Sequence, residues 1–579
     1  HKAIDAGATA FVKIDVPADW ANAAGDVAAP ELEGKPELVK QVREIMEPVG
    51  RMDGDSLPVS AFVGHEDGQF EQGASAYEKR GVAVSVPKWD SSTCIQCNQC
   101  SFVCPHATIR PYALTDEEVA AAPENLVAIS MKGKLKDTFR YTLAISPLDC
   151  MGCGVCVGVC PTDSLSMVGA EGELAEQDVF DYCVAEVADK PEVQDNSVKG
   201  SQFKQPLLEF SGSCAGCAET SYARLVTQLF GDRMFISNAT GCSSIWGGPA
   251  ATSPYTVNEE GRGPAWANSL FEDNAEHGFG MLQGHTAVRQ MVIEQTEQLL
   301  AAGVPEGAAA AAQAWLDARD DSAASKDASA AFVAELEKLA EGEGEASALA
   351  AKILANKDYL AKKSIWIFGG DGWAYDIGYG GLDHVLASGE DVNVFVFDTE
   401  VYSNTGGQAS KASNIGQVAQ FAAAGKNIAK KSLAEIAMQY GYVYVAQVAM
   451  GAKPAQTIKA IAEAEAYPGP SLIIGYSPCE MHAIKGGMKN CQEEMKKAVA
   501  CGYWNLFRYN PAAPAGKKFT LDCKEPAGGS QEFLMNEARY SRLTREFPER
   551  AAELFERNEE AAIDRYNHLV KLKELYAED

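Results

Sequence analysis

Two nearly identical cysteine runs constrain this chain of 579 residues more strongly than any other feature of its sequence. Each run has the spacing Cys-x-x-Cys-x-x-Cys-x-x-x-Cys-Pro, first at residues 94–105 and again at residues 150–161. Thiolates at these intervals typically hold iron–sulfur cubanes, with the fourth cysteine of each run reaching across to the other cluster. The repeat therefore favours two 4Fe–4S clusters over a zinc site or a disulfide framework, and it indicates a chain that transfers electrons.

The crossed ligand pattern divides the eight cysteines into two sets of four. We expect one cluster to be held by Cys94, Cys97, Cys100 and Cys160. We expect the other to be held by Cys150, Cys153, Cys156 and Cys104. Both sets lie within residues 88–200, which we interpret as a bacterial two-cluster ferredoxin-like domain with a polar insert at 113–140.

The composition excludes some partners and compartments. A net charge of −30 argues against binding to nucleic acid or to an anionic membrane. No apolar run approaches the ~18 residues that span a bilayer, and we find no secretory signal. Sixteen cysteines without such a signal indicate a reducing compartment with metal-bound thiolates, so we expect a cytoplasmic protein.

Changes in composition and hydrophobic periodicity along the chain predict several domains of α/β and α+β class, since 579 residues are too many for one core. The first residue is His1 rather than Met, so we expect a longer protein in which residues 1–20 end a preceding, truncated domain. We predict a small α/β domain at 21–87, the ferredoxin-like domain at 88–200, a large α/β domain at 201–530 with a helical insertion at about 300–362, and a C-terminal helical extension at 531–579.

Hydrophobic periodicity predicts individual elements within these domains. Near the N-terminus it predicts strands at 10–16, 59–63 and 81–86 and a helix at 36–46. In the large domain apolar strands alternate with helical stretches, which indicates a parallel sheet with crossover helices. Its strands are expected at 364–368, 393–397, 442–446 and 471–476.

Two strand ends in the large domain carry residues suited to a magnesium diphosphate. The strand at 364–368 leads into Gly370, Asp371 and Gly372, and a helix-compatible stretch follows. Glycines let the backbone approach phosphate oxygens, and a helix N-terminus favours the anion. The strand at 393–397 ends before Thr399, so a carboxylate and a neutral oxygen from two strand ends can complete an octahedral Mg²⁺.

A second set of cysteines opens the large domain. Cys214 and Cys217 form a Cys-x-x-Cys pair, Cys242 follows, and Cys479 lies far downstream. Taken alone, such a pair is compatible with a cluster, with zinc, or with no metal site.

With these motifs located, the chain resembles the C-terminal half of pyruvate:ferredoxin (flavodoxin) oxidoreductase, a family of thiamine-diphosphate enzymes of anaerobic metabolism. The resemblance extends over the whole length. The motifs that carry it are Cys94-Ile-Gln-Cys-Asn-Gln-Cys100, Cys214-Ala-Gly-Cys-Ala-Glu219-Thr, Gly241-Cys242-Ser-Ser-Ile-Trp246, Gly370-Asp-Gly-Trp373, Thr399-Glu-Val-Tyr-Ser-Asn404-Thr-Gly-Gly-Gln408 and Tyr476-Ser-Pro-Cys479.

The resemblance implies roles for particular residues. It implies a third 4Fe–4S cluster, proximal to the thiamine ring, on Cys214, Cys217, Cys242 and Cys479. It implies that Mg²⁺ is held by Asp371, the Thr399 hydroxyl and the Val401 carbonyl. It implies that Asn404 faces the substrate as a catalytic residue. The implied contacts with thiamine diphosphate come from Glu219, Cys242, Gly370, Asp371, Gly372, Trp373, Thr399, Glu400, Val401, Tyr402, Ser403 and Asn404.

The reaction implied by the resemblance is oxidative decarboxylation of pyruvate to acetyl-CoA and CO₂. Electrons would pass through three clusters to ferredoxin or flavodoxin, CoA would take the acetyl group, and the full-length protein would be a homodimer. Two alternatives stay open at this stage. One is a related enzyme that acts on 2-oxoglutarate or another 2-oxoacid, and the other is an electron-carrier subunit without thiamine chemistry.

In the resembling family, the glutamate that activates the aminopyrimidine ring of the cofactor comes from an N-terminal domain. We find no second unit in this sequence that could replace that domain. We therefore expect it to precede His1, and we expect the chain alone to be inactive with pyruvate because the ring would be poorly oriented.

The remaining cysteines and the histidines suggest no rival site. The eight histidines are scattered, and we expect none beside a Ser, Cys or carboxylate at catalytic spacing. The thiols without an assigned ligand role are expected to be buried apolar residues: Cys183, Cys491, Cys501 and Cys523.

Three cubanes of four irons each predict that anaerobically purified protein holds about 12 iron atoms, with matching sulfide. Iron and zinc analysis together with the visible absorbance spectrum checks this number. Stoichiometric zinc without iron–sulfur absorbance would show that the cysteine runs bind a different metal.

Overall fold

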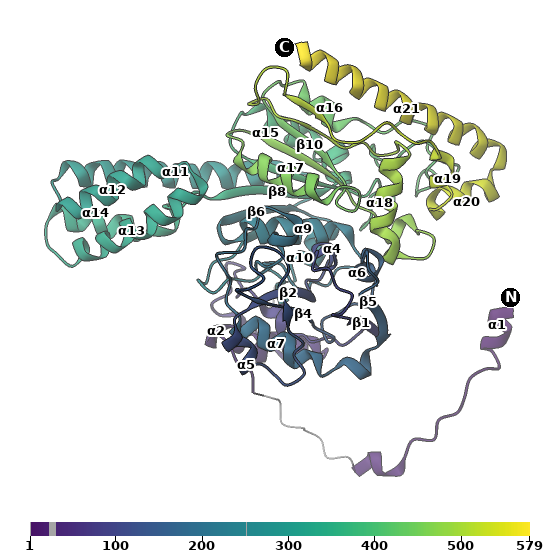
Figure 1. Cartoon of the computed structure of the whole chain (residues 1–579), viewed down its shortest axis with the longest axis horizontal. Helices are drawn as coiled ribbons and strands as arrows, with labels where there is room; N and C mark the ends of the chain where they lie inside the picture. Colours follow the sequence, from purple (N-terminus) through teal and green to yellow (C-terminus); the bar gives the residue numbers. More distant parts are fainter. Residues whose placement is uncertain (1, 23–30, 250–251, 579) are drawn as a thin grey trace.

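The computed structural model describes residues 2–22, 31–249 and 252–578. In Figure 1 a lower body carries the paired cysteine runs, and an upper body is built on a large sheet. A bundle of helices projects sideways from the upper body, and the C-terminal helix lies across its top. Residues 23–30, which fall in the predicted small domain, lie outside the described residues, and the predicted domain boundaries stay a prediction.

The upper body contains an eight-stranded sheet with the order β13-β12-β10-β11-β9-β8-β6-β7. The six strands from β10 to β7 are mutually parallel, whereas β12 and β13 pair antiparallel at one edge. This arrangement confirms the predicted parallel-rich α/β class. The strands are β6 (Met234–Ala239), β7 (Ala265–Ser269), β8 (Ser364–Gly370), β9 (Asn393–Asp398), β10 (Tyr444–Val448), β11 (Ser471–Tyr476), β12 (Phe507–Tyr509) and β13 (Phe519–Leu521).

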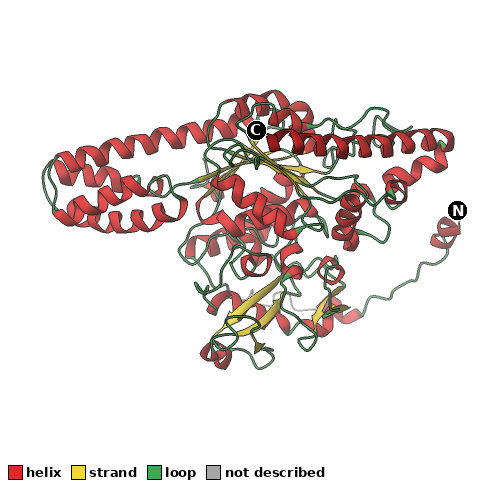
Figure 2. Ribbon diagram, turned by 45° about the horizontal axis from the view of Figure 1, so that its top comes forward, coloured by secondary structure: helices red, strands yellow, loops and turns green. Residues whose placement is uncertain are grey.

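Helices cover both faces of this sheet, so its central strands are buried on both sides. Every residue of β9 and β11 is buried, which explains why both strands are continuous apolar runs rather than alternating ones. The helices of this body are α9 (Ala218–Phe230), α10 (Cys242–Gly247), α15 (Tyr379–Ala387), α16 (Leu433–Met438), α17 (Pro454–Ala466) and α18 (Cys491–Ala500). Figure 2 shows the sheet enclosed between these helices.

The lower body folds the two cysteine runs in the same way. The first run enters helix α4 (Gln99–Val103) and the second enters α6 (Val155–Gly158). Left-handed backbone conformations recur at equivalent positions of the runs: Gln96 and Gly152, Asn98 and Gly154, and Ala107 and Asp163. The surrounding elements are β1 (Ser85–Trp89), β2 (Ile109–Leu114), α5 (Asp116–Ala121), β3 (Ile129–Ser130), β4 (Arg140–Ile145), β5 (Leu165–Gly169), α7 (Glu176–Glu186) and α8 (Val198–Ser201).

Near the N-terminus two predicted strands are wrong. Residues 10–16 form no strand, because their side chains are exposed and no neighbouring strand pairs with them. Residues 59–63 form a 3-10 turn, η4 (Val59–Phe62), immediately after Pro58. The strand predicted at 81–86 begins later, at Ser85, as β1.

The helix predicted at 36–46 is confirmed. It is continuous through α2 (Pro36–Gln41), a π-helical turn η2 (Val42–Met46) and α3 (Glu47–Gly50). The first helix of the chain is α1 (Lys2–Gly7), and 3-10 turns follow at η1 (Ala18–Asn22), η3 (Gly54–Ser56) and η5 (Ala74–Tyr77).

Between β7 and β8 the chain forms a bundle of four helices, the last three of which lie within the predicted insertion at about 300–362: α11 (Asn274–Ala301), α12 (Glu306–Ala318), α13 (Ser322–Ala340) and α14 (Glu345–Leu354). It has its own apolar core, separate from the core of the sheet body. In that core Trp315 stacks on Phe332 with 5.8 Å between ring centroids, and its Nε1 donates a hydrogen bond to the Leu360 carbonyl. The bundle therefore has the internal packing of a separate folding unit.

The predicted C-terminal extension is helical, with α19 (Ser530–Leu534), α20 (Ala538–Glu546) and α21 (Pro548–Glu578). Helix α21 packs on the sheet body, where Arg550 donates to the Ala424 carbonyl and Asn558 donates to the Ile415 carbonyl. Residues 410–427 are thus held against helix α21.

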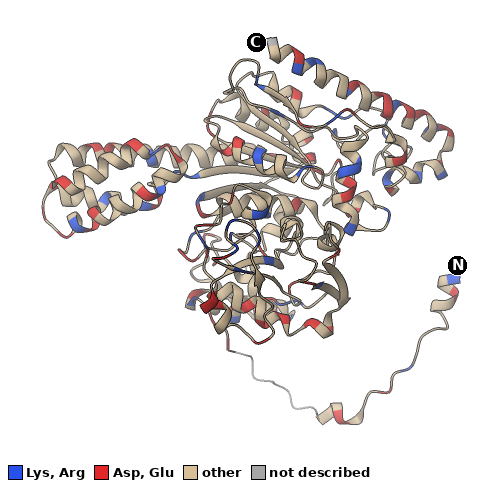
Figure 3. Ribbon diagram, viewed as in Figure 1, with Lys and Arg blue, Asp and Glu red and all other residues tan. Residues whose placement is uncertain are grey.

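The acidic excess is spread over the molecule. Figure 3 shows Asp and Glu on α21, on the projecting bundle and on the helices of the lower body. None of the helices that the structure describes has the length and apolarity required to cross a membrane.

Replacing Trp315 with Ala should destabilise the projecting bundle by about 3–5 kcal/mol, because the side chain is fully buried and its loss leaves a cavity. Urea unfolding followed by helical circular dichroism measures this change. The control is Trp20→Ala, since Trp20 is 67% exposed and its loss creates no cavity. Equal unfolding midpoints for the two variants would contradict the packing role of Trp315.

Candidate cofactor and cluster sites

The candidate site lies at the carboxyl ends of adjacent parallel strands. Four strands that are neighbours in the sheet, β6, β8, β9 and β11, each lead into one of the sequence motifs. Cys242 follows β6, Asp371 follows β8, Thr399 follows β9 and Cys479 follows β11. Ligands of open parallel sheets bind at this edge, so the topology brings together residues that are far apart in the sequence.

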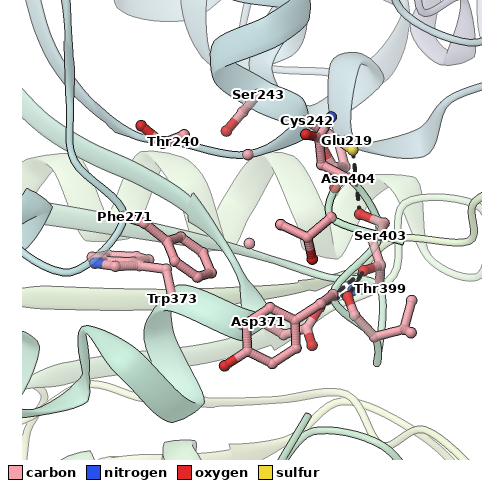
Figure 4. Close-up of a pocket in the computed structure, with 16 residues that line it drawn as sticks. Glu219, Thr240, Cys242, Ser243, Phe271, Asp371, Trp373, Thr399, Ser403 and Asn404 are labelled. Carbon is pink, nitrogen blue, oxygen red and sulfur yellow. Dashed lines mark hydrogen bonds between the residues drawn. The ribbon is translucent and has the colours of Figure 1, made fainter. Parts of the chain in front are cut away.

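A pocket of about 370 Å³ opens at this edge (Figure 4). The predicted residues that line it are Glu219, Cys242, Gly370, Asp371, Gly372, Trp373, Thr399, Val401, Tyr402, Ser403 and Asn404. Sequence reasoning missed further lining residues: Thr240, Gly241, Ser243, Phe271 and Thr405. Most of these flank a predicted residue in the chain, whereas Phe271 follows the edge strand β7 and carries no motif of its own.

Three oxygen donors meet at the base of the pocket. The Thr399 hydroxyl donates to Asp371 Oδ1 at 2.9 Å, and its oxygen lies 2.9 Å from the Val401 carbonyl oxygen. The second carboxylate oxygen of Asp371 accepts from the Ser410 hydroxyl at 2.6 Å. A carboxylate, a hydroxyl and a carbonyl are hard oxygen ligands of the kind that Mg²⁺ prefers, so the donor set fits that ion.

The electrostatics of Asp371 agree with this fit. Burial of the carboxyl, followed by the nearby charge of Asp398, raises the pKa of Asp371 above its ordinary value. A divalent cation at the three oxygens would oppose both effects by favouring the ionised carboxylate.

Close packing explains one glycine of the pocket. A Cβ atom on Gly372 would lie 2.5 Å from the ring of Tyr402, so only glycine fits beside that side chain. Gly372 begins a π-helical turn, η10 (Gly372–Ile377), that runs into α15. The start of this helical segment thus faces the pocket, as expected for a diphosphate site.

Glu400 differs from its predicted neighbours, because its side chain does not line the pocket. It has a φ of 62° and is fully buried. Its carboxylate forms ion pairs with Lys430 at 3.1 Å and Arg539 at 2.8 Å. Burial alone would raise the pKa of Glu400, but these two cations and the Tyr503 hydroxyl lower it to about 2. Glu400 thus anchors the loop after β9 through ion pairs that lie outside the pocket.

A histidine also contacts the loop after β9 and lies beside a carboxylate, contrary to the expectation that no histidine does so. His482 Nε2 lies 2.8 Å from the Thr399 carbonyl oxygen, and His482 Nδ1 lies 3.6 Å from Glu537. The sequence signal was its position three residues after Cys479, which alone was too weak to assign a role.

The structure brings together the first set of ferredoxin-type cysteines. Cys94, Cys97, Cys100 and Cys160 all line one cavity. Backbone amides point at sulfurs of the runs at matching positions, Gln96 N–H to Cys94 Sγ and Gly152 N–H to Cys150 Sγ, both at 3.4 Å. Such amide contacts favour thiolates that hold a metal cluster.

The second set is more deeply placed. The Cys156 thiol is fully enclosed, and burial together with the nearby sulfurs of Cys153, Cys104 and Cys150 raises its pKa. All members of the first set are partly exposed, whereas Cys104, Cys150 and Cys156 are buried. Iron bound at this set would oppose the shift in pKa, because its positive charge would stabilise the thiolate form of Cys156.

One member of the third set of cysteines, Cys242, lines the pocket. Cys242 Sγ lies 3.3 Å from the Ser403 hydroxyl, and both residues line the pocket (Figure 4). Cys217 and Cys479 each lie within electrostatic reach of Cys242 and of Glu219. Burial raises the pKa of Glu219 to about 7, and the indole N–H of Trp246 donates to its carboxylate.

Within the described residues, no group of three or more His, Cys, Asp or Glu side chains is arranged to hold a single metal ion. In a cubane each thiolate binds a different iron, so its ligands stand farther apart than the ligands of one zinc ion. Cysteines that hold a cubane therefore need not form such a group.

The four remaining cysteines are mostly buried, as predicted. Cys183 and Cys491 are fully buried and Cys501 is nearly so, whereas Cys523 is partly exposed. All of them are free thiols.

Comparison with protein families agrees with both halves of the site. Residues 87–179 match a family described as a 4Fe-4S dicluster domain, and residues 340–474 match the C-terminal TPP binding domain of thiamine pyrophosphate enzymes. Residues 27–83 match a domain of unknown function. The predicted cofactor types, thiamine diphosphate and 4Fe–4S clusters, are confirmed by these matches.

Curated relatives extend the similarity to nearly the whole chain. The chain is 52% identical to a pyruvate:ferredoxin oxidoreductase of Moorella thermoacetica, over 99% of this chain and 49% of that protein. It is 50% identical to a pyruvate-flavodoxin oxidoreductase of Klebsiella pneumoniae, over 98% of this chain and 48% of that protein. A mitochondrial pyruvate dehydrogenase [NADP(+)] of Euglena gracilis is 45% identical, over 97% of this chain and 31% of that protein. The resemblance to this family is confirmed, and the chain spans about half the length of the curated oxidoreductases it matches.

Cys94 and Cys100 of the first set pack against an apolar core around Tyr141, whereas Cys242 of the third set packs against the core of the sheet, so loss of one set should leave the other in place. Cys214→Ala should remove the signal of the third cluster alone, and Cys97→Ala should damage only the ferredoxin-type pair. Electron paramagnetic resonance of the dithionite-reduced variants measures each signal. Loss of all three signals from soluble, folded Cys97→Ala protein would contradict the assignment.

Proposed function

We propose that this chain, which aligns at 50–52% identity with about half the length of pyruvate-flavodoxin and pyruvate:ferredoxin oxidoreductases, carries the diphosphate site and the electron-transfer path of such an enzyme. The whole protein would oxidatively decarboxylate pyruvate with CoA as the acetyl acceptor, and it would act as a homodimer. The observation that carries the proposal is the contact between Cys242, a member of the third cysteine set, and Ser403. The Cys242 sulfur lies 3.3 Å from the Ser403 hydroxyl oxygen, and both residues line the pocket.

The residues at the base of the pocket would bind the diphosphate end of the cofactor. Asp371, the Thr399 hydroxyl and the Val401 carbonyl would hold Mg²⁺, and the start of the helical segment at Gly372 would face the phosphates. When bound, thiamine diphosphate supplies the carbon centre that makes decarboxylation of a 2-oxoacid possible. The residues of this chain would fix its position and exclude water from its inner end.

Residues on the other side of the pocket would bind the substrate and hold the cluster that accepts the electrons. Asn404 lines the pocket next to Ser403 and would donate hydrogen bonds to the 2-oxoacid. Cys214, Cys217, Cys242 and Cys479 would hold the cluster that receives electrons first. The second cysteine set would follow, because Val155, between Cys153 and Cys156, approaches Gly216 of the third set.

The cluster held by Cys94, Cys97, Cys100 and Cys160 would come last, since its cysteines are the partly exposed set. An external acceptor would take electrons there, and the printed names of the relatives indicate ferredoxin or flavodoxin. A related 2-oxoacid enzyme stays an alternative, because none of the described residues that line the pocket is a cation that would select one oxoacid.

An electron carrier without thiamine chemistry is less well supported. Such a subunit would not need a magnesium site. The oxygens of Asp371, Thr399 and Val401 nevertheless lie together, and all three residues are buried.

Asp371→Ala should abolish Mg²⁺-dependent binding of thiamine diphosphate while the iron content stays unchanged. The diphosphate loses its bridge to the protein, whereas no cysteine is altered. Calorimetric titration with thiamine diphosphate in Mg²⁺ or EDTA measures the affinity. Asp376→Ala is the matched control, because Asp376 is on the adjacent helical turn but does not line the pocket. Unchanged affinity of Asp371→Ala would exclude the proposed magnesium site.

The test of the proposed reaction is pyruvate- and CoA-dependent reduction of a viologen dye. The assay contains this chain together with the other half of a curated relative, the half that this chain does not match. We expect turnover with pyruvate, and loss of turnover with Asp371→Ala although the clusters are still reduced by dithionite. Turnover with another 2-oxoacid but not with pyruvate would favour the related enzyme. Absence of any 2-oxoacid-dependent reduction would contradict the proposal.

A further inference from the structure

A loop between β3 and β4 lies over the first cysteine set. The Lys132 ammonium donates to the Cys94 carbonyl at 2.7 Å, and the Lys132 N–H donates to the Gln96 side chain at 2.6 Å. Gln96 in turn donates to the Ser130 carbonyl at 2.8 Å. Leu135 packs against the same apolar core as Cys94, so the loop is anchored beside the cluster site.

This loop and the start of α8 present four lysines near the first cysteine set. Lys199 donates to the Lys132 carbonyl at 3.0 Å, and its ammonium is within electrostatic reach of Cys94 and Cys97. Lys134 and Lys136 flank Leu135 and are exposed. We call these residues the lysine patch: Lys132, Lys134, Lys136 and Lys199.

The lysine patch is unusual because its charges are not neutralised. Among the described residues, no carboxylate oxygen lies within 4.0 Å of the ammonium nitrogen of any of these lysines. Other lysines of the same body are paired, namely Lys88 with Glu173, Lys190 with Glu118 and Lys204 with Asp195. In a chain with a net charge of −30, four unpaired cations beside one site form a local reversal of sign.

One apolar side chain next to Cys94 is exposed. Ile95, between Cys94 and Gln96, is 46% exposed. The acidic positions nearest to these residues along the chain are Asp137 in the loop, Asp90 before the first run, Asp163 after Cys160, and Glu192 and Asp195 before α8, of which Asp195 pairs with Lys204. An apolar contact with a charged rim is the usual composition of a transient protein interface.

The geometry points to the lysine patch around Ile95 as the docking surface for a small acidic protein that carries one electron. This inference rests on the proposed function, since it requires a 4Fe–4S cluster on Cys94, Cys97, Cys100 and Cys160. In the transfer step the reduced cluster loses one electron and the carrier gains it, with no bond formed or broken. Opposite charges on the two surfaces raise the rate of encounter and orient the carrier toward the partly exposed cysteines.

The experiment uses the chain with its clusters reduced photochemically, mixed by stopped flow with an oxidised acidic flavodoxin. The test variant is Lys134→Glu/Lys136→Glu, because neither side chain makes a hydrogen bond or ion pair that the fold depends on. The matched control is Lys352→Glu/Lys357→Glu, which makes the same charge change at exposed, unpaired lysines of the projecting bundle and its end. Methyl viologen, a small dication, serves as a second acceptor that needs no docking surface.

We expect the test variant to reduce flavodoxin about tenfold more slowly than the control at low ionic strength, with the difference shrinking as salt is added. Its rate with methyl viologen should not fall. Equal flavodoxin rates for both variants, or a difference that salt does not change, would overturn the docking surface alone. An equal slowing with viologen would also overturn it, because the lysines would then act on the cluster itself. A wild-type chain that reduces neither acceptor would overturn the proposed function as well.

Discussion

The convergence of adjacent parallel strand ends is the constraint on which the candidate site depends. Because β6, β8, β9 and β11 run in the same direction and lie side by side, their carboxyl ends must meet at one edge of the sheet. Four motifs separated by up to hundreds of residues are thereby placed around one pocket. A register shift in any of these strands would displace its motif and reverse the faces of its side chains.

A buried ionic network holds the loop after β9 in place. Asp398 and Glu400 share Lys430, and Glu400 also pairs with Arg539 of helix α20. Removing one member would leave an uncompensated charge, which typically costs about 3–5 kcal/mol when the pair is fully buried. Since Thr399 and Val401 flank Glu400, the C-terminal helices help to fix the oxygen donors of the pocket. This provides a physical reason why the last part of the chain packs beside the site rather than extending from it.

The sequence predicted the parts of the fold in which local signals agree with tertiary structure. The strands at β8, β9 and β11 are continuous apolar runs that remain buried, and the cysteine runs repeat with the same left-handed turns. The predicted strand at 10–16 failed because alternating apolar residues form a strand only when another strand supplies hydrogen bonds. The one at 59–63 failed because a proline-led segment closed into a tight turn instead.

The site was predictable to a similar degree. Motif residues such as Asp371 and Cys242 could be located because they occupy recognisable spacings at strand ends. Phe271 and His482 could not, since each reaches the site only through tertiary packing. The side chain of Glu400 illustrates the converse limit: it lies within a motif, but its positive φ turns it away from the pocket and into the ionic network.

The central claim is that the third cysteine set and the diphosphate pocket form one site. Diffraction at the iron absorption edge from anaerobically grown crystals tests it most directly, because anomalous density locates iron without assumptions about the ligands. We predict three separate iron clusters, one of them bounded by Cys214, Cys217, Cys242 and Cys479 and adjacent to Ser403 at the pocket wall. Iron density at the two ferredoxin-type sets alone, with those four cysteines free, would contradict it.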